Sequence, residues 1–169
     1  MRFLKLALIS VFVLFALITA IGLMFPKDVT TSRTISLNVT PDSLYHFLAD
    51  VKYWKLWMQG AKDTTIQFLS AKTTGAGTVA KIGSNEVSIS KATPSSIEMV
   101  WEGERGSIMT SGFEILSNPS QHITTVEWYF QQHLQWYPWQ RFSSMLNEKM
   151  LGPGMEKSLD NLKQVVEEK

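Results

Sequence analysis

The sequence predicts an α+β domain in which a curved antiparallel sheet packs around a long C-terminal helix, preceded by one transmembrane helix. Three observations support this prediction. An uncharged apolar run covers residues 6–25, short segments separated by turn residues fill residues 64–130, and apolar residues recur at helical spacing from residue 136 onward. The 169 residues are enough for one domain with a buried core in addition to the apolar run.

The apolar run at residues 6–25 predicts a membrane-spanning helix, because 20 helical residues cover roughly the 30 Å of a bilayer core. Arg2 and Lys5 precede it, which predicts that residues 1–5 stay in the cytoplasm and that the domain lies on the extracytoplasmic side. The alternative is a signal peptide cleaved near Ala20-Ile21-Gly22, after which the domain is secreted. The apolar run continues beyond that site, which favours the uncleaved anchor.

The segment after the span divides into a polar linker at residues 26–32 and a globular domain at residues 33–169. The domain is expected to begin with a strand, because Thr34 to Val39 alternate polar and apolar side chains. A helix should follow to about Asp50, with Thr40 as its cap and Pro41 at its first position. Its buried face would carry Leu44, Phe47 and Leu48.

A second short helical turn is predicted at Lys52–Met58. Trp54 and Trp57 are three residues apart within it and therefore share a face. Gly60–Asp63 is interpreted as a turn that leads into the sheet.

The central part of the chain predicts a meander of antiparallel strands, since turn signals recur at short intervals without an intervening helical period. Six strands are expected, at residues 65–71, 78–82, 86–91, 96–102, 107–116 and 121–130, with a turn at Asn118-Pro119-Ser120 between the last two. Residues 136 to the end predict one long helix with a kink or break at Pro153, since proline removes a backbone donor.

This order of elements resembles the START-like superfamily, also called the SRPBCC or polyketide cyclase/dehydrase group, which has the helix-grip fold. The resemblance is carried by the opening strand, Thr40-Pro41-Asp42-Ser43-Leu44-Tyr45-His46-Phe47-Leu48, Asp50-Val51-Lys52-Tyr53-Trp54-Lys55-Leu56-Trp57 and the terminal helix. It implies a deep apolar cavity gripped by the C-terminal helix, used in the family for lipids, sterols, polyketides or plant hormones. An N-terminal membrane helix occurs in some bacterial members.

Inward-facing residues of the strands and helices are the candidate ligand-binding residues. Strand alternation places one set of them on a single sheet face, and Met and Trp suit adaptable apolar binding. The alternative for each is an ordinary place in the core. The candidates are Trp54, Trp57, Met99, Trp101, Met109, Phe113, Trp128, Phe130, Phe142 and Met145.

The composition argues against several classes of site. Without cysteine, thiolate chemistry and Cys-based metal sites are excluded, and the three histidines show no metal-ligand spacing, so no metal and no cofactor are expected. Arg2 and Lys5 account for two of the 16 basic residues, which leaves 14 against 15 acidic residues beyond the span. Nucleic-acid binding therefore has no electrostatic support.

The leading hypothesis is a membrane-anchored, non-catalytic binding domain for a hydrophobic or amphipathic small molecule such as a lipid. One alternative is a cyclase- or hydrolase-type enzyme that uses a polar group in the same cavity, with His122 or Glu127 as first candidates. The other is an envelope protein-interaction module that docks through the aromatic segment Trp136-Tyr137-Pro138-Trp139.

Overall fold

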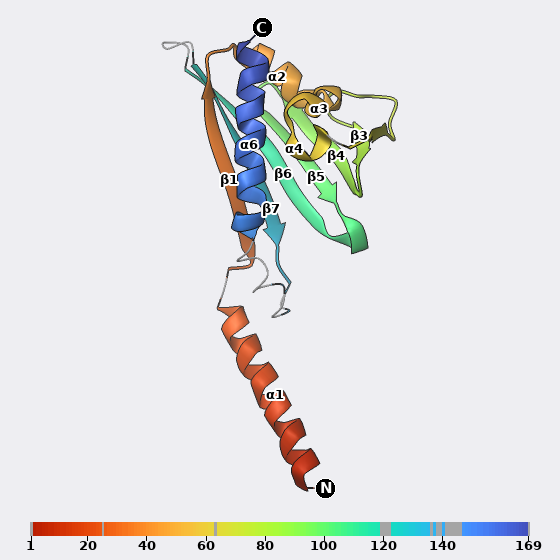
Figure 1. Cartoon of the computed structure of the whole chain (residues 1–169), viewed down its shortest axis with the longest axis vertical. Coiled ribbons are helices and arrows are strands. Elements are labelled where there is room, and N and C mark those ends of the chain that lie inside the picture. The colour runs from red at the N-terminus through yellow and green to blue at the C-terminus, as the bar shows by residue number, and fades with distance from the viewer. Residues whose placement is uncertain are drawn as a thin grey trace.

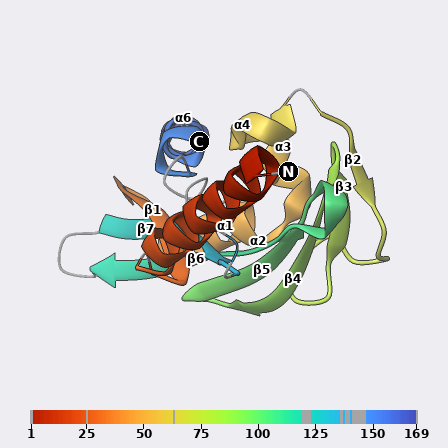
Figure 2. The same cartoon turned by 90° about the horizontal axis from the view of Figure 1, so that it is seen from below.

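The computed structural model describes residues 2–24, 26–62, 64–118, 123–135, 137, 140 and 147–168. A seven-stranded antiparallel sheet curves around α2, α3, α4 and α6, which lie on its inner face (Figures 1 and 2), and this confirms the predicted fold class. The strand order is β1-β7-β6-β5-β4-β3-β2. The elements are α1 (Arg2–Leu23), β1 (Asp28–Leu37), α2 (Pro41–Ala49), a 3-10 turn (Val51–Tyr53), α3 (Trp54–Trp57), α4 (Gln59–Lys62), β2 (Ile66–Phe68), β3 (Val79–Ile82), β4 (Asn85–Thr93), β5 (Ser96–Glu102), a 3-10 turn (Glu104–Gly106), β6 (Ile108–Asn118), β7 (Ile123–His133) and α6 (Asn147–Glu167).

Helix α1 extends away from the domain and is almost entirely exposed (Figure 1). Its 22 residues make it about 33 Å long. Among the described residues it is the one helix long and apolar enough to cross a membrane. A membrane anchor and a signal sequence share this length and composition.

The first strand is longer than the sequence predicts. β1 begins at Asp28, and residues 28–32 pair with residues 129–133 of β7. Most of the expected linker is therefore part of the sheet. The polar side chains of residues 28–32 predicted a linker. They are compatible with a strand because β1 is an edge strand and one of its faces meets solvent.

The helical segment after β1 follows its sequence signals. Thr40 caps α2 by accepting a hydrogen bond from the Ser43 amide at 3.4 Å, and Pro41 occupies the first turn. Trp54 and Trp57 are fully buried, with their ring centroids 6.5 Å apart. Residues 59–62 form the short helix α4, where the sequence analysis expected a turn. Gly60 obscures this helix in the sequence because glycine is a poor helix former.

The six predicted central strands are present as β2–β7, with shifted ends. β2 is shorter than expected, at Ile66–Phe68, and β5 has the predicted bounds of 96–102. A register shift between Ile89 and Lys91 marks a bulge in β4, which increases the local bend of the sheet. The predicted turn at Asn118-Pro119-Ser120 falls largely outside the described residues.

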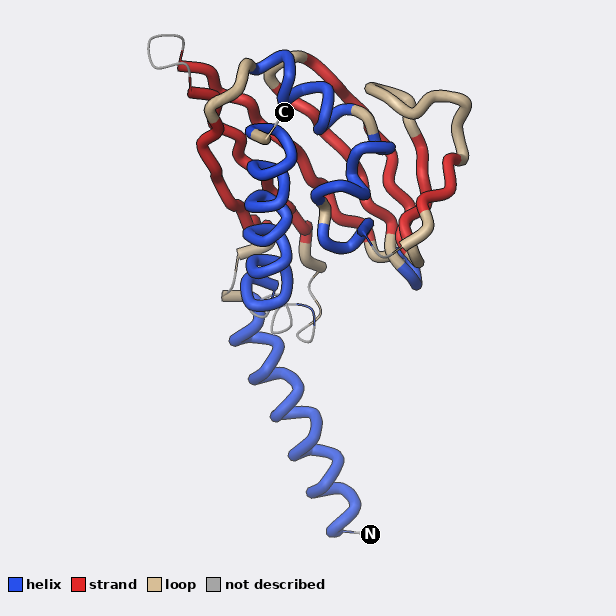
Figure 3. The backbone as a smooth tube through the Cα atoms, turned by 45° about the horizontal axis from the view of Figure 1, so that its top comes forward, coloured by secondary structure: helices blue, strands red, loops and turns tan. Residues whose placement is uncertain are grey.

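Helix α6 runs along β1 and beside α3 and α4, over the inner face of the sheet (Figure 3). The sequence predicts a kink or a break at Pro153, and the break is absent because α6 is continuous from Asn147 to Glu167. Met155 and Leu159 are buried after the proline, and Leu151 packs partly buried against the core before it, so tertiary packing maintains the helix. The part of the predicted helix at residues 141–146 lies outside the described residues.

Candidate functional site

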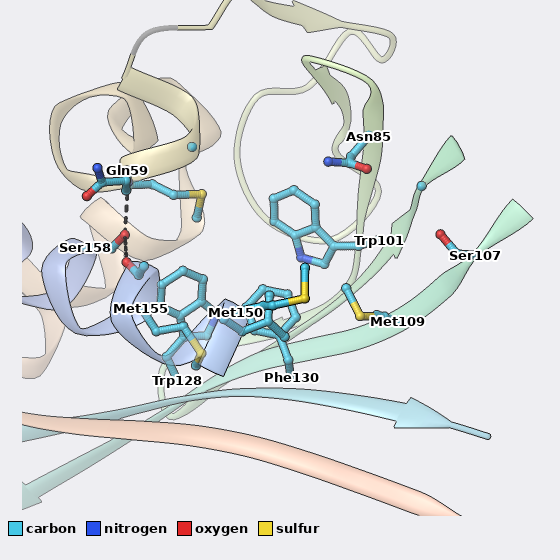
Figure 4. Close-up of a pocket in the computed structure, with 15 residues that line it drawn as sticks. Gln59, Asn85, Trp101, Ser107, Met109, Trp128, Phe130, Met150, Met155 and Ser158 are labelled. Carbon is cyan, nitrogen blue, oxygen red and sulfur yellow. Dashed lines mark hydrogen bonds between the residues drawn. The ribbon is translucent and has the colours of Figure 1, made fainter. Parts of the chain in front are cut away.

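A pocket of about 300 Å³ lies between the inner face of the sheet, α4 and the first half of α6 (Figure 4). Its volume is at the lower end of the range for small-molecule sites. Strands β4–β7 supply its floor, and α6 forms its opposite wall. The lining residues are Met58, Gln59, Gly60, Asn85, Trp101, Gly103, Ser107, Met109, Trp128, Phe130, Met150, Leu151, Gly154, Met155 and Ser158.

The pocket is located at one end of the sheet. The starts of β1, β4 and β6 and the ends of β5 and β7 lie at the same end of the sheet. The end of β7 pairs with the starts of β1 and β6, and the end of β5 pairs with the starts of β4 and β6. Asn85, Trp101, Ser107 and Phe130 line the pocket and belong to these ends. The pocket therefore lies at the end of the sheet where β1 begins, four residues after α1.

The lining is apolar and carries no ionisable side chain among the described residues. Methionines and aromatic rings supply most of it, and Met150 is 74% exposed at the mouth. The hydroxyl of Ser158 accepts a hydrogen bond from the Gln59 amide at 3.0 Å and donates one to the Gly154 carbonyl at 2.6 Å (Figure 4). This polar group is already used within the protein, so it serves to join α4 to α6.

The aromatic rings of the pocket continue into the core. Trp128 and Phe130 lie 5.3 Å apart, and Phe130 and Trp101 lie 6.2 Å apart, between ring centroids. Trp54 stacks on Trp101 from the core side at 6.0 Å. Contacts of this kind hold rings in fixed orientations, so the aromatic wall is rigid while the methionines opposite it can adapt.

The ten predicted ligand-binding residues fall into three groups. Trp101, Met109, Trp128 and Phe130 line the pocket together. Four others are fully buried in the core and do not line it: Trp54, Trp57, Met99 and Phe113. Phe142 and Met145 lie outside the described residues.

Strand alternation identified the correct sheet face, but it could not tell pocket from core. Residues of that face that lie near the strand ends line the pocket, and those further along the strands are covered by α2 and α3. Sequence reasoning also missed the wall formed by α6. Its signal is the four-residue spacing of Met150, Gly154 and Ser158 and of Leu151 and Met155, which places each set on one helix side.

An ion-pair cluster attaches the pocket half of α6 to β1. Arg33 binds Glu148 at 2.5 Å and Glu156 at 2.6 Å. The hydrogen bonds that Arg33 donates to Glu148 and Glu156 raise the pKa of Arg33, so the guanidinium stays charged. Gly152 lies against this guanidinium, and a Cβ there would collide with it. The absence of a side chain at Gly152 thus leaves room for the Arg33 guanidinium beside the helix.

The candidate acid–base residues do not gather in the pocket. Glu127 lies on the outer sheet face, paired across the strands with Glu114 and Thr34, and His122 lies outside the described residues. His133 pairs with Asp28 at 2.7 Å where β1 meets β7. Within the described ranges, no three His, Asp or Glu side chains are grouped so as to hold a metal ion.

Tyr129 is the partly buried ionisable group of the outer sheet face. Burial, and then the charges of Glu98 and Glu114, raise its pKa above the ordinary value. Its ring covers Gly112 on β6. The Tyr129 hydroxyl therefore lies on the sheet face opposite the pocket.

Residues 28–167 match the profile of the family described as polyketide cyclase/dehydrase and lipid transport. The chain belongs to this family. Membership associates it with binding of hydrophobic ligands or with cyclase/dehydrase-type domains, and the match begins at the first residue of β1. A comparison with curated proteins finds no match.

Solved structures share the fold of this polyketide cyclase/dehydrase-type domain. CalU16 from Micromonospora echinospora is 14% identical with a TM-score of 0.60, covering 81% of this chain and 73% of its own. Ara h 8.0201 is 12% identical with a TM-score of 0.57, covering 84% and 99%. A protein from Chromobacterium violaceum is 13% identical with a TM-score of 0.56, covering 84% and 98%. At these identities the likeness concerns the fold alone.

Proposed function

We propose that the domain binds a hydrophobic or amphipathic small molecule, such as a lipid, in the pocket beneath α6 and does not convert it chemically. The observation that carries this proposal is the pocket lining, which is rich in Met and Trp and has no ionisable side chain among the described residues. Transfer of apolar groups from water into such a lining stabilises a complex by about 0.8 kcal/mol per methylene.

The position of the pocket favours a ligand that comes from a membrane. The pocket lies at the end of the sheet where β1 begins, and only residues 24–27 separate β1 from α1. Four residues span at most about 3.6 Å each, so the chain cannot place this end far from the end of α1. We propose that α1 is an uncleaved anchor, with residues 1–5 cytoplasmic and the domain on the other side. A chain of unreduced mass in the purified membrane fraction would support the anchor, and a chain shortened near residue 22 would contradict it.

The enzyme hypothesis has less support from the described site. General acid–base catalysis needs a titratable group within hydrogen-bond reach of the substrate. The described lining offers none, and Glu127 lies on the opposite sheet face. Binding without conversion is therefore the function that the pocket chemistry favours.

The interaction-module hypothesis rests on the segment 136–139. Trp136, Pro138 and Trp139 lie outside the described residues, so no geometry supports a docking surface there. The pocket supplies the more specific hypothesis.

The proposal is tested by filling the pocket from α6. Gly154 lines the pocket, and a Cβ built on it meets no atom within 4 Å. Gly154→Leu should therefore place a side chain in the cavity, and leucine is a better helix former than glycine. The matched control is Gln164→Leu, which adds the same apolar side chain to an exposed position of the same helix.

The measurement is mass spectrometry of small molecules that co-purify with the three full-length chains from the same cells in the same detergent. An apolar molecule should accompany the wild type and Gln164→Leu, and Gly154→Leu should lose most of it. Equal amounts in all three chains, or none in the wild type, would contradict binding in this pocket.

A further inference from the structure

One buried donor in the pocket has no partner. The indole Nε1–H of Trp101 is shielded from solvent but makes no hydrogen bond. Burying such a group without an acceptor is unfavourable, and native proteins rarely do so. The other tryptophans with described positions all donate to an acceptor: Trp54 to the Leu48 carbonyl at 2.9 Å, Trp57 to the Phe47 carbonyl at 3.4 Å and Trp128 to the Ser111 hydroxyl at 3.0 Å.

The ring of Trp101 is held so that its nitrogen edge stays in the pocket. Trp54 stacks on it with ring planes 20° apart, and Phe130 contacts it from the strand β7 side. In Figure 4 the nitrogen edge points toward Met150, away from the backbone of β5. The neighbouring rings pack against the indole in this orientation, in which Nε1 has no protein acceptor.

Met150 gives a ligand access to this edge. Its side chain is 74% exposed and belongs to the first turn of α6 described by the structure. An unbranched thioether side chain changes rotamer readily and packs well against apolar guests. A ligand can therefore displace the Met150 side chain from the nitrogen edge of Trp101.

Among the described residues that line the pocket, no other side chain offers a comparable buried donor. The Ser158 hydroxyl is already bonded to Gln59 and Gly154. Asn85 is exposed at the rim, and so is Ser107. Among the described lining residues, Trp101 therefore carries the one buried side-chain donor left for a guest.

We infer that the Trp101 N–H donates a hydrogen bond to an oxygen atom of the ligand, so that the pocket selects largely apolar molecules bearing a ketone, ester or alcohol oxygen over plain hydrocarbons. This inference rests on the proposed function, because it specifies the chemistry of the guest in the same pocket. A net hydrogen bond in an apolar site gives about tenfold in affinity, and that is the preference expected here.

The test compares two probes of similar shape, methyl octyl ketone and decane, on the full chain in nanodiscs. The variant is Trp101→Phe, which keeps an aromatic ring and removes the N–H. Trp57→Phe is the matched control, since Trp57 is buried in the core, does not line the pocket and gives its N–H to the Phe47 carbonyl. Partition of each probe into the bilayer is the same for every variant, so it cancels when the ketone-to-decane affinity ratios of two variants are compared.

Trp101→Phe should lower the affinity ratio of ketone to decane about tenfold, and Trp57→Phe should leave the ratio unchanged. In wild-type protein with isotope-labelled tryptophan, one indole proton resonance should shift downfield with the ketone and not with decane. That resonance should be absent in Trp101→Phe.

An affinity ratio that is equal in the wild type and Trp101→Phe, with no ketone-specific shift, would overturn the role of Trp101. The pocket itself would still bind apolar guests in that case, so the proposed function would stand. Failure of the wild type to bind either probe would overturn both.

Discussion

Gly112 shows how one missing side chain shapes the sheet. A Cβ at this position would collide with the Tyr129 hydroxyl and lie 2.7 Å from the Ile97 carbonyl oxygen. Gly112→Ala should therefore lower the free energy of unfolding by about 1–3 kcal/mol, because the strands on either side cannot move apart without losing hydrogen bonds. Denaturant titration of the full chain in detergent measures this loss.

The control for that prediction is Gly60→Ala. A Cβ on Gly60 meets no atom within 4 Å, and the residue lies in α4. Alanine there should leave stability unchanged or raise it by up to about 1 kcal/mol. Equal losses of unfolding free energy in Gly112→Ala and Gly60→Ala would contradict a steric clash specific to residue 112.

Tyr129 gives the sheet a pH dependence in the alkaline range. Burial, with help from Glu98 and Glu114, raises its folded-state pKa above 10.0, the value expected when the chain unfolds. The folded protein thus holds the proton more tightly than the unfolded chain. The stabilisation is fully present below about pH 10 and is lost as pH rises through the folded-state pKa.

Tyr129→Phe removes this titration. The difference in unfolding free energy between wild type and variant should therefore shift against the wild type between about pH 9 and pH 11. Urea unfolding at the two pH values measures it. A difference in unfolding free energy that stays constant between about pH 9 and pH 11 would contradict a raised pKa of Tyr129 in the folded protein.

At the residue scale, the sequence predicts which side chains face inward but not which of them meet a cavity. Met99 and Trp101 share a face of β5 by alternation. In the folded protein Met99 is fully buried, whereas Trp101, two residues nearer the strand end, reaches the pocket. The helices cover only part of the inner sheet face, and the limit of that part depends on the curvature of several strands. No single segment of the sequence encodes this curvature.

At the level of elements, Arg33 links β1 to the pocket half of α6. Arg33→Gln should loosen residues 148–156, because Glu148 and Glu156 lose their shared cation. Backbone amides in this segment should then exchange hydrogen faster than in the wild type. The difference should shrink in high salt, since both carboxylates are more than half exposed and salt screens them.

Lys91→Gln is the control for Arg33→Gln. Lys91 also pairs with a carboxylate, Glu98, but both belong to neighbouring strands of the sheet and not to α6. Its loss should leave exchange in α6 unchanged. Faster exchange in α6 with both variants would point to a general effect of lost charge.

Elements with strong local signals were predicted best. The cap and proline before α2 and the alternation along β5 act within a few residues, so the sequence contains them fully. The predictions of a linker before the domain and of a break at Pro153 were wrong for the opposite reason. Pairing with β7 orders the polar residues 28–32, and packing against the sheet outweighs the helix hydrogen bond that is lost at Pro153. Both contacts come from distant parts of the chain.

For the whole molecule, the shared location of the pocket and the start of β1 predicts an orientation at the membrane. Ile108 and Leu116 are both exposed outward-facing residues of β6, 62% and 59% exposed. They are separated by roughly 26 Å, since a strand rises about 3.3 Å per residue. Ile108 lies at the pocket end of the sheet and Leu116 at the opposite end.

The natural chain has no cysteine, so Ile108→Cys and Leu116→Cys each provide a single labelling site. With the full chain in vesicles, a fluorophore at residue 108 should be quenched by spin-labelled lipid headgroups more strongly than one at residue 116. Stronger quenching at residue 116 would mean that the pocket opens away from the bilayer, and a ligand would then have to enter through water. Stronger quenching at residue 108 would place the mouth beside the headgroups, where an amphipathic guest can pass into the pocket without full exposure of its apolar part to solvent.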